Sequence, residues 1–229
     1  MTFTVLLREP GAGIIAAATA SRSLAVGNAV LAVDPAVGAV ASQAWTNRAL
    51  RHRMLDALHD GQDAAAVVAR IDEWDAEPPL RQVAALPLRG APAARTGEGT
   101  TAWAGHRVLD DAVVVGNLLT GPEVADAMVA RVAGERLPAA DATRTALAAA
   151  RLLLATLESG QAAGGDRRGQ QSAALVVAIA EPGRHWPAEA LIDLRVDDDP
   201  KPLPELGRLL SLRGAELADA RGPLSSREG

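Results

Sequence analysis

Apolar residues in the first part of the chain form short runs that are rich in β-branched side chains and separated by turn residues. Runs of this length and composition are typical of β-strands. Pro10-Gly11 and Asp34-Pro35 mark two of the turns between them. The pattern predicts strands over residues 2–8, 14–20, 25–33 and 37–42.

The pattern then changes to helical spacing. Thr46 or Asn47 can cap a helix whose apolar residues recur at helical intervals up to Gly61. Asp63 can cap a second helix, which Pro78-Pro79 ends. The same spacing predicts further helices over residues 122–134, 140–159 and 203–212. The apolar runs between them predict strands over residues 82–88, 93–96, 113–119, 172–180 and 190–196.

The order of these elements distinguishes between fold classes. A doubly wound parallel fold alternates strand and helix, whereas here strands occur in runs and helices in pairs. We therefore expect an α+β fold, a four-layer αββα sandwich in which two antiparallel sheets lie between helical layers. A single domain is expected to span residues 1–212, and the weak periodicity of residues 213–229 predicts a mobile C-terminal tail.

Composition and charge exclude several classes of function. The formal net charge is -5 and the 23 Lys and Arg residues are dispersed, which argues against nucleic acid as a partner. The chain has no cysteine, so disulfides, thiolate metal sites and cysteine nucleophiles are excluded. The acidic turn Asp197-Asp198-Asp199 lacks the spacing of a calcium loop. We expect neither a metal nor a cofactor.

The sequence also bears on location and assembly. No stretch approaches the roughly 20 consecutive apolar residues that cross a bilayer, and the N-terminal residues do not have the pattern of a secretion signal. We expect a soluble cytoplasmic protein without a membrane partner. The high content of Ala, Val and Leu is compatible with a homodimer.

Thr2, which opens the first predicted strand, is the first candidate for chemistry. If Met1 is removed, Thr2 carries a hydroxyl and a free α-amine on one residue. The amine, with a reference pKa of about 7.7 to 8.0, can act as the base that activates the hydroxyl. The alternative interpretation is that Thr2 is a good strand former and nothing more.

Several segments carry a resemblance to a known family. They are Met1-Thr2-Phe3, Leu24-Ala25-Val26-Gly27, residues 38–47, Gly116-Asn117 with Gly121-Pro122-Glu123-Val124, residues 160–174 and residues 193–198. In these segments the chain resembles a bacterial family of unknown function that is grouped with the N-terminal-nucleophile (Ntn) hydrolases. The resemblance spans residues 1–212. It implies the four-layer αββα fold and hydrolysis of an amide bond by the N-terminal residue.

Asn117 is the best side-chain candidate for stabilising a reaction intermediate. Amide hydrolysis passes through a tetrahedral intermediate, and its oxyanion needs hydrogen-bond donors. Asn117 follows Gly116 at the end of a predicted strand. The alternative is that Asn117 caps the turn into the next helix.

Polar residues at other strand ends are candidates for contacts with a substrate. Ser21 and Arg22 lie at the far end of the strand that should pair with the first, so we expect them to flank Thr2. A guanidinium and exposed backbone amides in a glycine-rich loop suit an anionic group. Each set also has a structural interpretation, because strand-end residues form turns and an Asp can pair with an Arg to hold its loop. The remaining candidates are Gln43, Trp45, Thr46, Asp166 and Arg167.

These observations lead to three hypotheses about function. The first is an amidohydrolase that cleaves an amide bond in a small polar substrate, with Thr2 as nucleophile after removal of Met1 and Arg22 or Arg167 orienting the substrate. The second is a noncatalytic protein that binds a small anionic ligand in the same place. The third is a structural homo-oligomer with no ligand.

Overall fold

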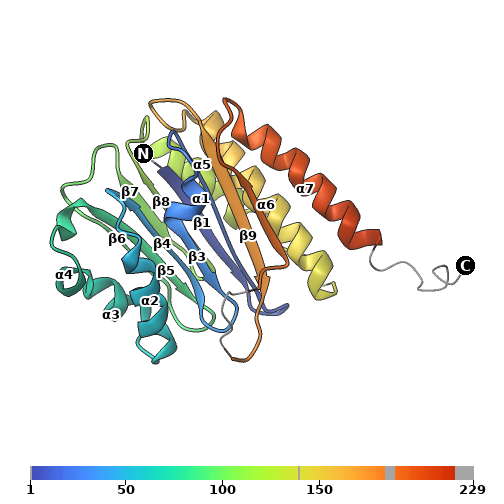
Figure 1. Ribbon diagram of the computed structural model, residues 1–229, viewed down its shortest axis with the longest axis horizontal. Coiled ribbons are helices and arrows are strands. Elements are labelled where there is room, and N and C mark those ends of the chain that lie inside the picture. The colour runs from blue at the N-terminus through green and yellow to red at the C-terminus, as the bar shows by residue number, and fades with distance from the viewer. Residues whose placement is uncertain (1, 139, 184–188, 220–229) are drawn as a thin grey trace, which may run out of the picture.

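Two antiparallel sheets face each other at the centre of the molecule, and helices cover their outer faces (Figure 1). The computed structural model describes residues 2–138, 140–183 and 189–219. The expectation of an α+β architecture with two antiparallel sheets and outer helices is confirmed. Within these residues no helix combines the length and the apolar character that crossing a membrane requires.

The larger sheet has six strands in the order β10-β9-β2-β1-β8-β7. All neighbouring strands in it run antiparallel, and β1 lies in its interior between β2 and β8. The strands are β1 Thr2–Glu9, β2 Ile14–Ser21, β7 Gly105–Val108, β8 Ala112–Asn117, β9 Ser172–Ile179 and β10 Ile192–Val196.

The smaller sheet has four strands in the order β3-β4-β5-β6, again antiparallel throughout. Because it is narrower, it cannot cover the whole inner face of the larger sheet. Its strands are β3 Leu31–Asp34, β4 Gly38–Ala44, β5 Arg81–Pro87 and β6 Ala93–Thr96.

The helices form two outer layers. In Figure 1, α5, α6 and α7 lie on one side of the sheets, and α2, α3 and α4 lie on the other. The first group packs on the larger sheet and the second on the smaller sheet. The helices are α1 Val26–Val30, α2 Ala49–His59, α3 Ala64–Ala69, α4 Ile71–Trp74, α5 Pro122–Ala133, α6 Ala142–Ala162 and α7 Pro202–Asp219, with a 3₁₀ turn at Pro78–Leu80.

Alternation along β1 decides which side chains enter the space between the sheets. Phe3 and Val5 belong to the apolar cluster beneath α5 and α6. Leu6 belongs to the apolar cluster between the two sheets. Since alternate residues of a strand point to the same face, Thr2 and Thr4 share the inter-sheet face with Leu6. The inter-sheet layer is therefore apolar around Leu6 and polar where β1 begins.

The predicted strand over residues 25–33 is wrong in its first half. Residues Val26–Val30 form the short helix α1, and the strand begins only at Leu31. The helix buries both Val26 and Val30, which are four positions apart. A Cβ at Gly27 would lie 2.4 Å from the Ala174 Cβ, so the missing side chain lets α1 approach β9.

Other boundaries also differ from the sequence-based expectation. The strand that begins near residue 113 ends at Asn117, because Leu118 has a positive φ of 55°. A strand at residues 105–108, β7, was not expected. The last helix continues past Leu212 to Asp219, so part of the expected tail is helical, and residues 220–229 of that tail lie outside the described residues.

Candidate functional site

Thr2 lies between the ends of two neighbouring strands. In the register of the larger sheet it is opposite Ser21 of β2 on one side and Asn117 of β8 on the other. Side chains opposite each other on adjacent strands share a face, with Cβ atoms about 4.5–5.5 Å apart. The Thr2 hydroxyl donates a hydrogen bond of 3.2 Å to Ser21 Oγ. All three residues are buried.

Two glutamines of the smaller sheet reach across to these residues. Gln43 Nε2 donates to the Thr2 carbonyl oxygen at 3.3 Å and to Gln82 Oε1 at 2.7 Å. Gln82 Oε1 also accepts from Asn117 Nδ2 at 3.0 Å. Both glutamines are fully buried. Thr2 and Asn117 are thus connected through the opposite sheet.

Two threonines extend the same network into the layer between the sheets. The Thr4 hydroxyl donates to Gln43 Oε1 at 2.6 Å and contacts the Thr19 hydroxyl at 2.8 Å. The Thr19 hydroxyl also reaches the Phe3 carbonyl oxygen at 3.3 Å. Buried polar groups cost free energy unless they are paired, and these are paired. We call the following residues the inter-sheet polar cluster: Thr2, Thr4, Thr19, Ser21, Gln43, Gln82 and Asn117.

A histidine lies beyond Gln82 in the same chain of hydrogen bonds. Gln82 Nε2 donates to Thr96 Oγ1 at 2.9 Å, and Thr96 Oγ1 lies 2.9 Å from His106 Nδ1. This contact suits either neutral tautomer, because the Thr96 hydroxyl can donate to Nδ1 or accept from an Nδ1–H. Burial, and then the neighbouring Arg107 charge, lower the pKa of His106 below its usual 6.5, in agreement with the neutral ring.

The chain takes a left-handed backbone conformation directly after two members of the cluster. Ala44, which follows Gln43, has φ 71°, and Leu118, which follows Asn117, has φ 55°. This conformation costs a residue with a side chain about 1–3 kcal/mol and is concentrated at functional sites. Of the three described non-glycine residues with positive φ, Ala44 and Leu118 thus follow cluster members, and Ala25 does not.

Asp166 holds its loop to the end of β2. Its carboxylate accepts hydrogen bonds from the backbone N–H of Arg22 at 2.9 Å and of Arg168 at 2.8 Å, and from the Arg168 guanidinium at 3.3 Å. A bridge to Leu119 joins the loop to the end of β8. Asp166 is buried, so these contacts favour the structural interpretation of Asp166 over direct contact with a ligand.

Two exposed guanidiniums, Arg22 after the end of β2 and Arg167 in the loop, lie near Asp166. Arg22 follows Ser21, and its Nη1 donates to Gln171 Oε1 at 2.7 Å. Arg167 follows Asp166, and its Nη1 donates to the Ala102 carbonyl oxygen at 3.3 Å. Both side chains are exposed, so either can meet a solute that approaches this end.

Trp45 and Thr46 lie at the end of β4, two and three residues beyond Gln43. Trp45 is 63% exposed, and Thr46 is exposed as well. Arg81 fixes the Trp45 main chain through a 2.5 Å hydrogen bond from Nη1 to the carbonyl oxygen. Arg81 is itself held by Asp75 through bonds of 2.8 and 2.9 Å. The guanidinium of Arg81, with Asn47, holds the pKa of Asp75 well below its usual range.

The structure thus brings four of the sequence-predicted residues, Thr2, Ser21, Gln43 and Asn117, into one hydrogen-bonded group. The other candidates lie around it, at the loop or strand ends described above. Two residues of the network, Gln82 and the half-buried His106 of β7, are not among the sequence-predicted candidates. A single amide between Arg81 and the apolar part of a predicted strand was the available signal for Gln82.

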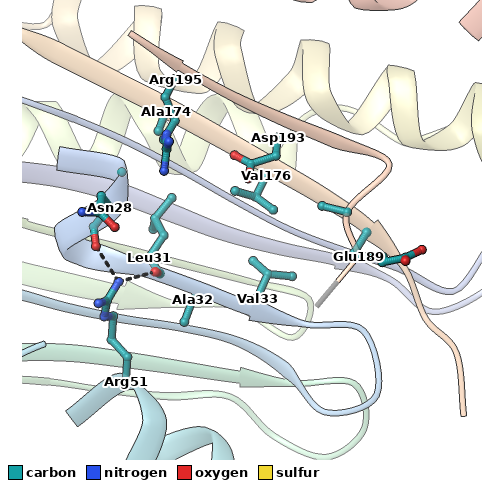
Figure 2. A pocket seen from close by; sticks show the side chains of 13 residues that line it. Asn28, Leu31, Ala32, Val33, Arg51, Ala174, Val176, Glu189, Asp193 and Arg195 are labelled. Carbon is teal, nitrogen blue, oxygen red and sulfur yellow. Dashed lines mark hydrogen bonds between the residues drawn. The ribbon is translucent and has the colours of Figure 1, made fainter. Parts of the chain in front are cut away.

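A separate cleft of about 190 Å³ lies where the narrow sheet leaves the larger sheet uncovered (Figure 2). Arg51 enters it and donates to the carbonyl oxygens of Asn28 at 2.9 Å and Leu31 at 2.7 Å. Thr2 does not line this cleft, and it does not line three further clefts formed by described residues. In the described ranges, no three His, Asp or Glu side chains are grouped as metal ligands.

Comparison with known proteins identifies relatives that match nearly the whole chain. The crystal structure of protein SPO2555 from Silicibacter pomeroyi, a DUF1028 protein, superposes with a TM-score of 0.78 at 29% sequence identity, covering 92% of this chain and 88% of that chain. No functionally curated protein matches the chain. The model of DUF1028, described as a family of unknown function, matches residues 2–206. The chain therefore belongs to the DUF1028 family.

Proposed function

We propose that this protein is an Ntn hydrolase that cleaves an amide bond in a small polar substrate, with Thr2 as the nucleophile. The observation that carries the proposal is the convergence of the Thr2 hydroxyl, Ser21 and Asn117 at the ends of three adjacent strands. The sandwich of two antiparallel sheets is the architecture that the resemblance implies. The proposal requires cleavage of the peptide bond before Thr2, which frees its α-amine.

The reaction begins with attack by the Thr2 hydroxyl oxygen on the carbonyl carbon of the substrate amide. The hydroxyl proton passes to the Thr2 α-amine, whose reference pKa of about 7.7 to 8.0 suits a base at neutral pH. The tetrahedral intermediate collapses, and the leaving amine takes the proton from the α-ammonium. Water then attacks the Thr2 ester, gives its proton to the α-amine, and the Thr2 oxygen recovers that proton as the acid product leaves.

Ser21 and Asn117 have different tasks in this scheme. Before a substrate binds, the Thr2 hydroxyl donates to Ser21 Oγ, which holds the Thr2 oxygen in place; for attack the same proton turns from Ser21 to the α-amine. Asn117 gives one N–H to Gln82 Oε1, and its second N–H has no hydrogen-bond partner among the described residues. That N–H serves as an oxyanion donor, a role worth about 3–4 kcal/mol of transition-state stabilisation.

The exposed groups around the cluster indicate the class of substrate. The guanidiniums of Arg22 and Arg167 suit a carboxylate or phosphate on the substrate. The exposed Trp45 ring, next to the end of β4, adds an apolar surface. A small amide with an anionic group satisfies both features.

The decisive experiment combines intact-mass analysis with a threonine-reactive β-lactone. Protein with a free Thr2 should gain a single adduct that maps to Thr2. Thr2→Val keeps the shape of the side chain but removes the hydroxyl, so it should gain no adduct, whereas Thr2→Ser should still react. Labelling of Thr2→Val at the wild-type rate, in protein whose mass shows a free residue 2, would rule out Thr2 as the nucleophile.

The burial of Thr2 supports a second candidate function. Thr2 is 6% exposed, which suits a noncatalytic protein that binds a small anionic ligand through Arg22 and Arg167. In that case thermal stabilisation by an anionic ligand survives Thr2→Ala and is lost in Arg22→Ala or Arg167→Ala. Loss of stabilisation in Thr2→Ala alone argues for the hydrolase instead.

A further inference from the structure

Gln82 is the residue through which most of the cluster is connected. It is fully buried on β5 of the smaller sheet. Its Oε1 accepts from Gln43 and Asn117, and its Nε2 reaches the carbonyl oxygens of Gly116 at 2.8 Å and Gly105 at 3.0 Å, together with Thr96. One carboxamide therefore contacts four other strands.

These partners allow only one orientation of the Gln82 carboxamide. The carbonyl oxygens of Gly105 and Gly116 belong to the main chain and can only accept hydrogen bonds. If Gln82 were reversed, its oxygen would face both carbonyls and its NH₂ group would face the NH₂ groups of Gln43 and Asn117. Every one of these contacts would become unfavourable, so the main chain fixes the direction of Gln82.

The direction of Gln82 in turn fixes the direction of Asn117. Because Gln82 Oε1 is an acceptor, Asn117 must present its NH₂ group, which leaves the second N–H as a donor on the face that it shares with Thr2. The same oxygen orients Gln43, whose NH₂ group then reaches the Thr2 carbonyl oxygen. Gln82 thus orients both Asn117, which lies opposite Thr2, and Gln43, which donates to the Thr2 carbonyl oxygen.

We propose that Gln82 is a positioning residue for the hydrolysis of an amide by Thr2: it holds Asn117 in the orientation that donates to the oxyanion. This inference rests on the proposed function. It adds a requirement that the proposed function alone does not have, namely that a residue on the opposite sheet, with no contact to the substrate, determines the rate of acylation.

The test is a double-mutant cycle between Gln82 and Asn117. The measured quantity is the second-order rate constant for acylation by a threonine-reactive β-lactone, followed by intact mass at a temperature where each variant is folded. Asn117→Ala should lower the rate about 100-fold or more, as expected for an oxyanion donor. Gln82→Leu should lower it by at least about 10-fold, and the double variant should match Asn117→Ala alone.

Thr156→Val, which removes a buried hydrogen bond to Leu152 within α6, is the control for lost stability and should acylate at the wild-type rate.

Each outcome separates the two proposals. A wild-type rate in folded Gln82→Leu overturns the positioning role, and so does a double variant that is slower than Asn117→Ala by the full Gln82→Leu factor; in both cases Thr2 remains the nucleophile. Labelling that persists in Thr2→Val overturns the proposed function itself. The comparison of Thr2→Val with the wild type therefore comes first.

Gln82→Glu provides a second test if Gln82→Leu does not fold. While the introduced carboxyl group is protonated, it can still accept from Asn117 and donate to one carbonyl oxygen. Once it is ionised, a charged oxygen faces the Gly105 and Gly116 carbonyls. The ratio of variant to wild-type acylation rate should therefore rise as the pH falls. A ratio that stays constant with pH in folded Gln82→Glu overturns the proposal.

Discussion

Gln43 and Gln82 lie opposite each other on β4 and β5, and a 2.7 Å hydrogen bond from Gln43 Nε2 to Gln82 Oε1 joins their carboxamides. Each glutamine then contacts the larger sheet at a different point, Gln43 at Thr2 and Thr4, and Gln82 at Asn117. The pair therefore fixes how the two sheets meet at the end where β1 begins.

Gln43→Leu should reduce stability because it keeps the volume of the side chain but removes this connection. The Thr2 carbonyl oxygen and the Thr4 hydroxyl each lose a buried partner, at about 1–3 kcal/mol for each unsatisfied group. We expect the free energy of unfolding in urea to fall by about 2–4 kcal/mol. Gln62→Leu, at a half-buried glutamine outside the sheets, is the matched control. An equal loss in both variants would contradict the prediction.

Asp75→Asn should destabilise the end of the smaller sheet. Asp75 is buried and forms a two-bond ion pair with Arg81, and removing one partner of a buried pair costs about 3–5 kcal/mol. The measurement is the urea unfolding midpoint. Glu205→Gln, which breaks the exposed pair with Arg208 on α7, should have little effect.

The same ion pair should make the stability of the protein depend on pH in the acidic range. The pKa of Asp75 is lowered in the folded protein, chiefly by the Arg81 hydrogen bond. Its contribution is therefore fully present above the unfolded pKa of about 3.9 and is lost as the pH falls toward the folded pKa. In Asp75→Asn the decline of the melting temperature below pH 4 should be shallower than in the wild type. A decline of unchanged slope would exclude Asp75 as its source.

His106 should make the protein less stable in mild acid. Burial lowers its folded pKa below the unfolded value of about 6.5, so protons bind the unfolded chain more tightly. The free energy of unfolding should be constant above pH 7 and fall as the pH drops below 6.5. His106→Gln should remove this component, and His59→Gln, at an exposed position on α2, should leave it unchanged. The comparison requires unfolding curves at pH 7.5 and 5.5.

Two glycines should respond to alanine in opposite directions. A Cβ at Gly27 of α1 would lie 2.4 Å from the Ala174 Cβ, so Gly27→Ala should destabilise by about 1–3 kcal/mol through overpacking. A Cβ at Gly214 of α7 would meet only the Leu147 Cδ2 at 3.7 Å. Gly214→Ala should stabilise by about 0.5–1 kcal/mol through helix propensity. Thermal melts of the two variants provide the check.

Local patterns predicted most of the strands and helices, and they predicted that Ser21 would flank Thr2. That prediction succeeded because β1 and β2 form a hairpin, which is a short-range feature. The strand assigned to residues 25–33 failed because Val26 and Val30 are buried at a spacing that a helix also satisfies. In the folded protein this segment packs closely against Ala174 of β9, a contact that no local pattern contains.

The candidate site was predictable only in part for the same reason. Gln43 was selected as a strand-end residue that could line a pocket, but its partners Gln82 and Thr4 come from segments 39 residues away in either direction along the chain. Gln82 belongs to an ordinary strand pattern and gains its role when β5 packs beneath β8. Contacts of this kind depend on how two sheets are stacked, which strand periodicity does not specify.

The side chains of the inter-sheet polar cluster are hydroxyls and carboxamides, and none carries a formal charge. Dissolved ions screen charges, with a Debye length of about 10 Å at 0.1 M ionic strength and about 3 Å at 1 M. The geometry around Thr2 should therefore be indifferent to ionic strength, whereas attraction of an anionic substrate by the exposed Arg22 and Arg167 should weaken. Added salt would then raise KM and leave kcat unchanged. The salt dependence of the two constants would therefore distinguish substrate binding from the chemical step.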